Sequence, residues 1–313
     1  MPDIVVMFFL LGLLAGVVKS DLTIPKAAYD TLSLLLMLTI GLKGGMALYG
    51  NLDWSIVPEL LAVAAIGALI PLALMPVLRR LVRLSAADSA SIAAHYGSVS
   101  AGTFAVALAF AESRALPIGA EVTLYLVMME LPAIMVAIAL YRRHAGKNSS
   151  EALQGIWHET LTNRGVILLA GGAVIGAMYG PADGANVTDL LMGAFHAVLA
   201  LFLLQMGLTA AETLRPIPWF HWRLLTFALV APLLLSLVGM TVGLTLGLPS
   251  GSVLILTALT ASASYIAAPA AMRTAIPKAS IGLAMLASLG FTFPLNVIVG
   301  IPLYHHVIQW MAG

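Results

Sequence analysis

Two serine-rich motifs lie in the middle of otherwise apolar stretches of this sequence. They read Gly97-Ser98-Val99-Ser100-Ala101-Gly102-Thr103 and Thr260-Ala261-Ser262-Ala263-Ser264-Tyr265, and Pro269 follows the second. Glycine, serine and proline at mid-membrane depth free backbone groups, which is tolerated only where the backbone is buried in protein or lines a watery cavity. Freed amides, helix N-termini and hydroxyl groups bind anions. The two motifs therefore predict a binding site for a small anion between two broken helices.

Each motif, taken alone, also fits a simpler role. Small residues let membrane helices pack closely, and many membrane helices carry them for that reason. Two such motifs at matching positions favour a site, because broken helices that meet near the midplane form the binding sites of many transporters. The residues expected to touch the anion are Ser98, Val99, Ser100, Ala101, Gly102, Ser262, Ala263, Ser264 and Tyr265.

A carboxylate midway along another apolar stretch predicts a cation site. Glu130 lies near the middle of the segment 119–141, and an intramembrane carboxylate is costly enough to mark a functional position. Its simpler role would be a protonated or hydrogen-bonded packing residue. Oxygen ligands without thiolates or a histidine cluster suit an alkali cation rather than a transition metal. We predict a sodium site whose ligands are Glu130, Ser98, Ser100, Ser262, Thr292 and Asn296.

The histidines offer a weaker alternative, a membrane-embedded hydrolase. His95 and Ser98 are three residues apart and share a helix face, as a base and a nucleophile would. The surrounding sequence is not a G-x-S-x-G elbow, and catalysis gives no reason for a duplicated serine motif, so we expect no enzyme. Other polar residues, expected to form interhelical hydrogen bonds or to lie at the membrane edge, are Tyr96, His196, Gln205, His305 and His306.

Composition identifies the setting of these residues as a membrane. Of 313 residues, 61% are hydrophobic and only 9% are charged, with a mean hydropathy of +1.01, against about 25% charged residues in a soluble domain. Fifteen Lys and Arg against 14 Asp and Glu leave no basic stripe for nucleic acid. The absence of cysteine excludes disulfides and thiolate metal sites. We therefore expect an all-α integral membrane protein.

Apolar runs predict about ten spans. A spanning helix needs about 20 mostly apolar residues. If the loops alternate between sides, 13 of the 15 Lys and Arg fall on one side and only Lys43 and Arg114 on the other. This bias predicts that both termini lie outside. The expected spans are 4–18, 27–48, 55–78, 86–112, 119–141, 165–180, 187–211, 222–247, 251–276 and 280–309.

The two halves of the chain resemble each other. Residues 84–100 align with 248–264 at an offset of 164, which superposes Ser98 on Ser262. Small residues also match by chance, but further matches follow in the same order at nearly the same offset. Halves of five spans each must have opposite orientations, as in many secondary transporters. We expect two inverted repeats, 1–150 and 151–313, with broken helices crossing at the midplane.

At these positions the sequence resembles the sodium-dependent bicarbonate transporters of cyanobacteria and other bacteria. The resemblance is spread over nearly the whole chain. It rests on five blocks, which are Gly41-Leu42-Lys43-Gly44-Gly45, His95 to Phe104, Met129-Glu130-Leu131-Pro132-Ala133-Ile134, Ala261 to Arg273, and Ser288 to Asn296.

The resemblance implies sodium-coupled symport of bicarbonate, or a similar small anion, across the bacterial plasma (inner) membrane. It implies bicarbonate between the breaks at 98–100 and 262–264 with sodium nearby, core and gate domains built from both repeats, an elevator-like mechanism and a homotrimer. A cytoplasmic PII-like regulator would bind the loops 79–85 and 142–164. An alternative transporter would exchange sodium for protons at Glu130 without binding an anion.

Overall fold

The computed structural model of the chain is built from helices throughout its described part. It describes residues 3–50, 54–145, 162, 164–214 and 221–312, and no strand occurs within those ranges. The first half contains α1 (Ile4–Val17), α2 (Lys26–Leu48), η1 (Trp54–Ile56), α3 (Val57–Val77), the π-helical turn η2 (Leu78–Val82), α4 (Ala86–Gly97), α5 (Ala101–Ser113), η3 (Ala120–Thr123) and α6 (Leu124–Ala145). The second half contains α8 (Arg164–Asp183), α9 (Ala185–Thr213), α10 (Trp222–Thr245), α11 (Ser250–Thr260), α12 (Ala267–Ala275), α13 (Ile281–Met285), η5 (Leu286–Thr292), α14 (Phe293–Leu295), η6 (Asn296–Gly300) and α15 (Ile301–Ala312).

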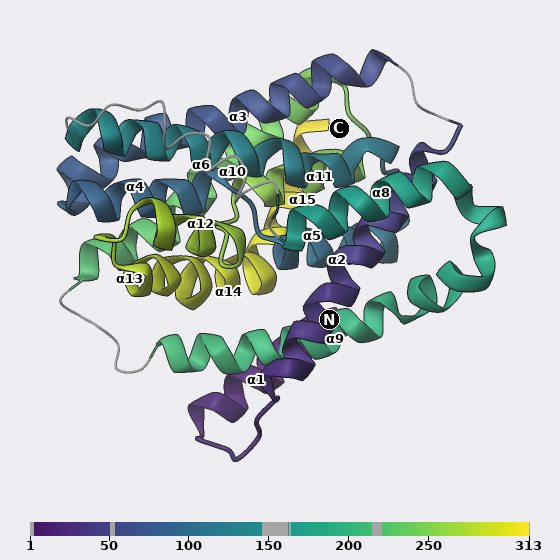
Figure 1. Cartoon of the computed structure of the whole chain (residues 1–313), viewed down its shortest axis with the longest axis horizontal. Coiled ribbons are helices and arrows are strands. Elements are labelled where there is room, and N and C mark those ends of the chain that lie inside the picture. The colour runs from purple at the N-terminus through teal and green to yellow at the C-terminus, as the bar shows by residue number, and fades with distance from the viewer. Residues whose placement is uncertain (1–2, 51–53, 146–161, 163, 215–220, 313) are drawn as a thin grey trace.

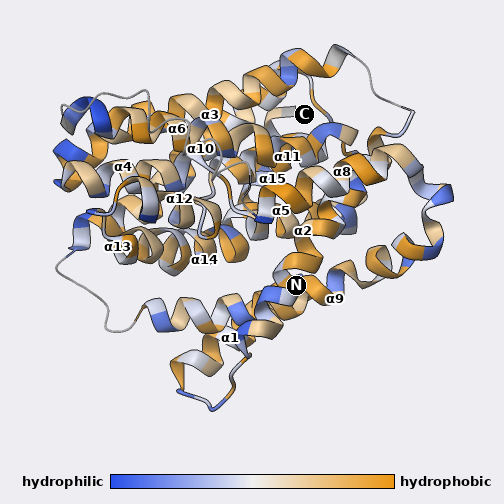
Figure 2. Cartoon of the chain, in the orientation of Figure 1, coloured by the Kyte–Doolittle hydropathy of each residue, from blue (hydrophilic) through white to orange (hydrophobic). Residues whose placement is uncertain are grey.

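Eight helical stretches in the described part of the chain are long and apolar enough to cross a membrane. Figure 2 shows the matching pattern, with hydrophobic helix bodies and most hydrophilic positions near helix ends and loops. The eight stretches correspond to eight of the ten expected spans. The expected first span is the 14-residue α1, and the expected ninth span is divided into the short helices α11 and α12. The structure therefore supports a multi-pass all-α membrane protein.

Two long helix pairs pack tightly through glycine. Helix α1 packs along α9 and α2 packs along α8, so each pair joins one helix from each half of the chain (Figure 1). Gly176 of α8 lies directly against the Leu42 carbonyl of α2, and Gly207 of α9 lies against the Phe9 carbonyl of α1. A side chain at either position would collide with backbone. Glycine therefore sets the distance between the helices of both pairs.

The remaining helices pack around two broken ones. Helix α3 packs on α4 and α6, and α10 packs on α11. The breaks separate α4 from α5 and α11 from α12, and they cross, because α5 contacts α11 while α12 contacts α4. The stretch Ala86–Ser113 is 94% buried in its most apolar window. The first broken helix is therefore enclosed by protein, as backbone without helical hydrogen bonds requires in a membrane.

The C-terminal helix is continuous but irregular. The turns η5 and η6 are π-helical and flank the short α14, which contains Pro294. π-Helical turns are rare and occur often at functional sites. Their wider winding changes which side chains share a face, and this affects the positions of Thr292 and Asn296.

The glycine contacts predict how sensitive the helix pairs are to small substitutions. Gly176→Ala should destabilise the protein, because its methyl group would meet α2 backbone and overpacking costs about 1–3 kcal/mol. Gly171→Ala, on the same helix with no atom within 4 Å of the added carbon, should be neutral or stabilising, since alanine favours helix by up to about 1 kcal/mol. Thermal unfolding of the two variants in detergent tests this. Equal midpoints would contradict the role assigned to Gly176.

Candidate functional site

The first break is formed by three residues between α4 and α5. Helix α4 ends at Gly97 and Ser98 is extended, with φ −75° and ψ −177°. Ser100 is also extended and caps α5, because its Oγ accepts a hydrogen bond from the Thr103 amide at 3.0 Å. Serine is favoured at this position since its side chain satisfies an amide that lacks a helical partner. The sequence thus ends one helix and begins another within the buried interior.

The second break resembles the first in its chemistry. Six residues, 261–266, separate α11 from α12. Ser264 accepts a hydrogen bond from the Ala268 amide at 3.2 Å, as Ser100 does for its own helix. Ser262 donates through its Oγ to the Leu259 carbonyl at 2.8 Å. In each break, therefore, the later serine of the motif satisfies an amide of the helix that follows.

The two breaks are hydrogen-bonded to each other. The Ser100 amide donates to Ser262 Oγ at 3.0 Å, and the Ser264 amide donates to the His95 carbonyl at 2.7 Å. Buried backbone groups outside a helix must find such partners, because no water is available in hydrocarbon. Each break thus satisfies an amide of the other, and the crossing geometry is fixed by these two bonds.

Two hydroxyls at the crossing, those of Ser98 and Tyr265, have no hydrogen-bond partner among the described residues. Ser98 Oγ is fully buried and has no hydrogen-bond partner among the described residues, although the equivalent Ser262 has two. Nearby in sequence, His95 donates through Nδ1 to the Ser91 carbonyl, 2.7 Å away. Its buried Nε2 has no hydrogen-bond partner among the described residues. A buried polar atom without a partner is costly, so these atoms are available to a ligand.

A small, partly open cavity lies beside the breaks. About 20 Å³ is open to the centre of a water-sized sphere, enough for a water molecule or a body of similar size. Its polar lining includes Glu130, whose side chain is 8% exposed, together with Ser100 and Ser264. The described lining residues include no lysine or arginine. The cavity therefore places one carboxylate beside the starts of α5 and α12.

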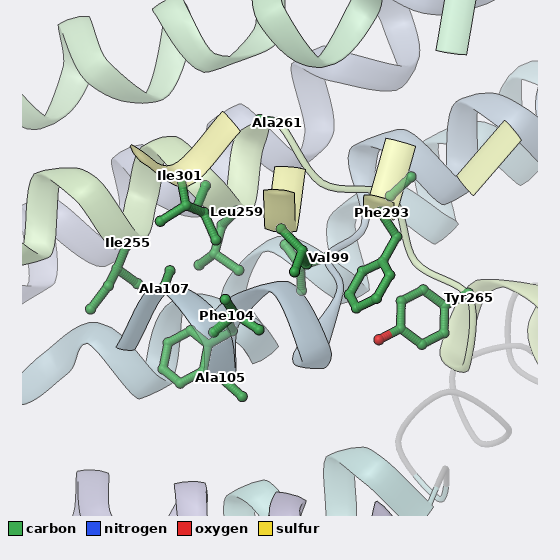
Figure 3. Packing of buried hydrophobic residues seen from close by; sticks show 14 of the residues in the cluster. Val99, Phe104, Ala105, Ala107, Ile255, Leu259, Ala261, Tyr265, Phe293 and Ile301 are labelled. Carbon is green, nitrogen blue, oxygen red and sulfur yellow. The ribbon is translucent and has the colours of Figure 1, made fainter. Parts of the chain in front are cut away.

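Six of the predicted site residues line this cavity directly. They are Val99, Ser100, Ala101, Glu130, Ser264 and Tyr265. Ser98, Ser262 and Ala263 are buried in the breaks but do not line it. Gly102 faces the Tyr265 hydroxyl, and a side chain at Gly102 would displace it. The Tyr265 ring meets the Phe293 ring edge-on with centroids 5.3 Å apart, beside Val99 (Figure 3).

Thr292 and Asn296 lie elsewhere, against the helices that hold the breaks. Thr292 donates to the Ala228 carbonyl at 2.9 Å and accepts from the Tyr96 hydroxyl at 2.6 Å. Asn296 donates to the Ala261 carbonyl at 2.7 Å and accepts from Tyr304 at 2.8 Å. Neither lines the cavity. Their expected role as sodium ligands stays a prediction, whereas their contacts stabilise both broken helices.

The cavity also has lining residues that the sequence analysis did not identify. Met37 of α2, Leu126 of α6, and Gly165 and Leu169 of α8 complete the lining together with Ile266 and Ala267. In a sequence, an apolar side chain that lines a cavity cannot be distinguished from an apolar side chain that faces lipid. The closely spaced glycines of α2 and α8 were the available indication, because they show that these two helices pack tightly. The cavity thus lies where the α2–α8 pair meets the broken helices.

The other polar residues singled out in the sequence are outside the cavity. His196 is 55% exposed, with Nε2 4.0 Å from a carboxylate oxygen of Glu112. Gln205 donates to Thr209 at 3.1 Å on the same helix. His306 is exposed, as expected of an interfacial residue, whereas His305 is buried against the Phe110 ring.

The chain matches a known protein family over nearly its whole length. The family model described as the Na+-dependent bicarbonate transporter superfamily matches residues 4–309. That range includes both serine motifs, Glu130 and every helix that lines the cavity. No curated protein matches the chain.

The unequal bonding of Ser98 and Ser262 predicts different effects on stability. Ser262→Ala removes the acceptor of the buried Ser100 amide, so it should lower the free energy of unfolding by about 1–3 kcal/mol. Ser98→Ala removes a hydroxyl without a partner in the described chain and should leave stability unchanged or slightly higher. Thermal unfolding in detergent measures both variants. A loss of stability in Ser98→Ala as large as in Ser262→Ala would contradict this assignment.

Proposed function

The chain belongs to the Na+-dependent bicarbonate transporter superfamily, and we propose that it carries bicarbonate, or a similarly small anion, across the membrane together with sodium. One observation carries this proposal. Two broken helices cross and are hydrogen-bonded to each other, and the helices that follow both breaks begin at one cavity containing a single carboxylate. The geometry supplies complementary groups for an anion and for a cation side by side.

Two helix N-termini would hold the anion. Ala101 and Ala267, the first residues of α5 and α12, line the cavity. The amides of a first helical turn lack helical partners and carry the positive end of the helix dipole, which attracts anions. The cap hydroxyls already bind the third amide of α5 and the second amide of α12, so the amides of Ala101, Gly102 and Ala267 are the proposed donors. The Ser98 hydroxyl has no partner within the described residues but does not line the cavity, so it would add a donor only to an anion that extends into the first break. No fixed positive side chain is then needed at the site.

Glu130 would hold the sodium, and its charge gives the reason for coupling. A carboxylate beside the anion's position repels it in this buried setting, where charges are poorly screened. Sodium between the carboxylate and the hydroxyl oxygens of Ser100 and Ser264 would remove that repulsion. The site therefore binds both ions better than either alone. Sodium is a transported substrate in this mechanism, because it leaves the site with the anion.

Sodium/proton exchange is the second candidate for the same cavity. It would use Glu130 alone and give no role to the two helix N-termini. The paired starts of α5 and α12 at the cavity favour the anion transporter. The family description favours it as well.

We propose the inverted-repeat architecture on the basis of reciprocal packing. If the second half repeats the first, α8 and α9 correspond to α1 and α2, so the α1–α9 and α2–α8 pairs are each other's counterparts. The same exchange relates the α5–α11 contact to the α12–α4 contact. The full layout is then ten spans in two inverted repeats, with the expected boundary near residue 150.

The gate in this proposal consists of α1, α2, α8 and α9, and the other helices form the core. The cavity lies between them, since α2 and α8 supply Met37 and Leu169 while the core supplies the breaks. Lys43 of α2 binds Glu112 of α5 at 2.5 Å, and both are partly exposed. Exposed ion pairs are weak, about 0–1 kcal/mol. Such a contact can break and reform as the core moves past the gate in an elevator-like cycle.

The proposal also covers the orientation of the protein in the membrane and the surfaces that would contact lipid, other copies of the chain and a regulator. Both termini are proposed to lie outside the bacterial inner membrane, with Arg79, Arg80 and Arg83 on the cytoplasmic face. Apolar side chains on the gate, among them Leu14 at 59% and Leu190 at 80% exposure, would meet lipid or the other copies of a homotrimer. A PII-like regulator would bind at 79–85 and 142–164. Residues 146–161 and 163 of the second segment lie outside the described chain.

Uptake of labelled bicarbonate into proteoliposomes tests the proposal. An inward sodium gradient should drive uptake, and an equal potassium gradient should not. If no bicarbonate enters, the same vesicles are assayed with other small anions and for proton flux. Sodium-driven uptake of another anion would replace the substrate only, whereas sodium-driven proton flux without anion uptake would establish the exchanger and overturn the proposal.

Glu130→Gln should remove the sodium dependence of uptake. The loss of a charged ligand, about 1.5–3 kcal/mol, lowers sodium affinity at least roughly tenfold, so uptake should no longer respond to the sodium concentrations that drive it in the unsubstituted protein. Glu121→Gln is the matched control, because Glu121 is equally buried at 8% and does not line the cavity. Uptake is measured against sodium concentration for both variants. Unchanged sodium dependence in Glu130→Gln would remove Glu130 from the site.

A further inference from the structure

An apolar groove runs along the surface between α3 with η2 and the first half of α10. It has a volume of about 510 Å³ and is lined by side chains that include Val77, Leu81, Val230 and Leu234. Leu81 is 70% exposed and Leu234 is 60% exposed. In a membrane-spanning chain, these side chains face hydrocarbon, which contains no water. The occupant of this groove is therefore apolar over most of its length.

A polar hollow of about 460 Å³ continues the groove at one end. The groove and the hollow share Val82, Arg83, Trp222 and Arg223 as lining residues. This end lies where α3 finishes and α10 begins, so it is at a membrane face. Trp222 is 59% exposed, and tryptophan is enriched at the level of lipid head groups. The combined site is thus apolar along the bilayer and polar at its surface.

The polar end is positively charged. Arg80, Arg83 and Arg223 line the groove or the hollow. The Arg223 guanidinium lies 5.3 Å from the centre of the Trp222 ring, which holds it at the mouth of the groove. Asp88 is the acid among the described lining residues, and it already accepts hydrogen bonds from Ser85 Oγ at 2.6 Å and the Ser280 amide at 2.7 Å. The combined site is therefore lined by three guanidinium groups and, within the described residues, one carboxylate that has other partners.

We propose that this site binds one anionic diacyl phospholipid, with its phosphate at the arginines and its acyl chains in the groove. The guanidinium group matches phosphate because it presents several donors in one plane. The α10 wall runs from Trp222 to Leu235, roughly 20 Å of helix at about 1.5 Å per residue. One leaflet of a hydrocarbon core about 30 Å thick is about 15 Å deep. The groove is thus long enough for the chains of one leaflet.

Charge selects an anionic lipid over a zwitterionic one. A zwitterionic head group brings its own cation to the three arginines, whereas an anionic head group has a net negative charge. The phosphate would also lie near the start of α10, the positive end of its dipole. By the positive-inside bias, this lipid belongs to the cytoplasmic leaflet, although binding itself does not depend on that orientation.

The position of the groove gives the lipid a structural role. One wall, α3, packs on the broken-helix segment α4, and the other wall, α10, packs on α11. A lipid between the walls contacts the two helices that hold the breaks from outside. Lipid occupancy therefore adds contacts between the two halves of the core. This role goes beyond ion coupling and does not require it.

Fluorescence quenching by brominated lipid tests the site in the full chain. The protein is reconstituted into phosphatidylcholine vesicles that contain a small fraction of dibrominated phosphatidylglycerol or, separately, dibrominated phosphatidylcholine. The difference in quenching between the unsubstituted protein and Trp222→Phe gives the contribution of Trp222. That contribution should be quenched more strongly by the brominated phosphatidylglycerol. Arg83→Gln and Arg223→Gln should each weaken this preference about fivefold, as expected for one basic residue at an anionic membrane surface.

Arg79→Gln is the matched control. Arg79 is exposed next to Arg80 and lines neither the groove nor the hollow, so its loss should leave the preference unchanged. High salt should reduce the preference in the unsubstituted protein, which tests the proposal even if a variant fails to fold. Equal quenching by the two lipids, or an unchanged preference in both Arg83→Gln and Arg223→Gln, would overturn the proposal. Absence of Trp222 quenching by either lipid would also overturn it, because a regulator or a second copy would then cover the groove. None of these outcomes depends on bicarbonate transport.

Discussion

Backbone hydrogen bonding in a waterless interior is the constraint on which the rest of this structure depends. Two helices stop in the buried core, and each must find partners for the groups that it frees. The Ser100 amide uses Ser262 Oγ, and the Ser264 amide uses the His95 carbonyl. Each broken helix depends on the other for a hydrogen-bond acceptor. The free amides are therefore satisfied only when the two halves of the chain cross in this arrangement. The starts of α5 and α12 are thereby brought to one cavity, and the candidate site follows from how the breaks are stabilised.

The glycine-packed pairs form a second, more regular part of the molecule. Gly176 and Gly207 bring α8 onto α2 and α9 onto α1 at backbone contact. These helices make few polar contacts with the broken helices. One such contact is the ion pair between Lys43 of α2 and Glu112 of α5. In the proposed mechanism these two parts move relative to each other, and a partly exposed ion pair between them can break and reform. Met37 and Leu169 meet the breaks at that same boundary, so movement there would expose or enclose the cavity.

Much of this could be predicted from the sequence, because the strongest constraints of a membrane are visible in composition. Apolar length located the spans, glycine and serine within apolar runs located both breaks and five of the cavity residues, and the charge of Glu130 within an apolar run located a sixth. The hydrogen bonds between the breaks could not be predicted, because the partner of a free amide depends on how two helices cross. The expected sodium site placed Thr292 and Asn296 with Glu130, but η5 and η6 are π-helical and wind differently from an α-helix. Thr292 and Asn296 consequently face Ala228 and Ala261 rather than the cavity.

The two breaks have similar helix caps but differ in their other polar contacts, and the proposed two-ion site uses that difference. Ser262 and Asn296 use their polar groups to satisfy the protein's own backbone. At the position equivalent to Ser262, Ser98 leaves its hydroxyl without a partner in the described chain, and Glu130 adds a carboxylate to the cavity from the first half. In the proposed mechanism, one half supplies the groups that bind ligand and the other supplies much of the support. Without Glu130, a symmetric pair of breaks would offer two helix N-termini to an anion but no carboxylate to the cation.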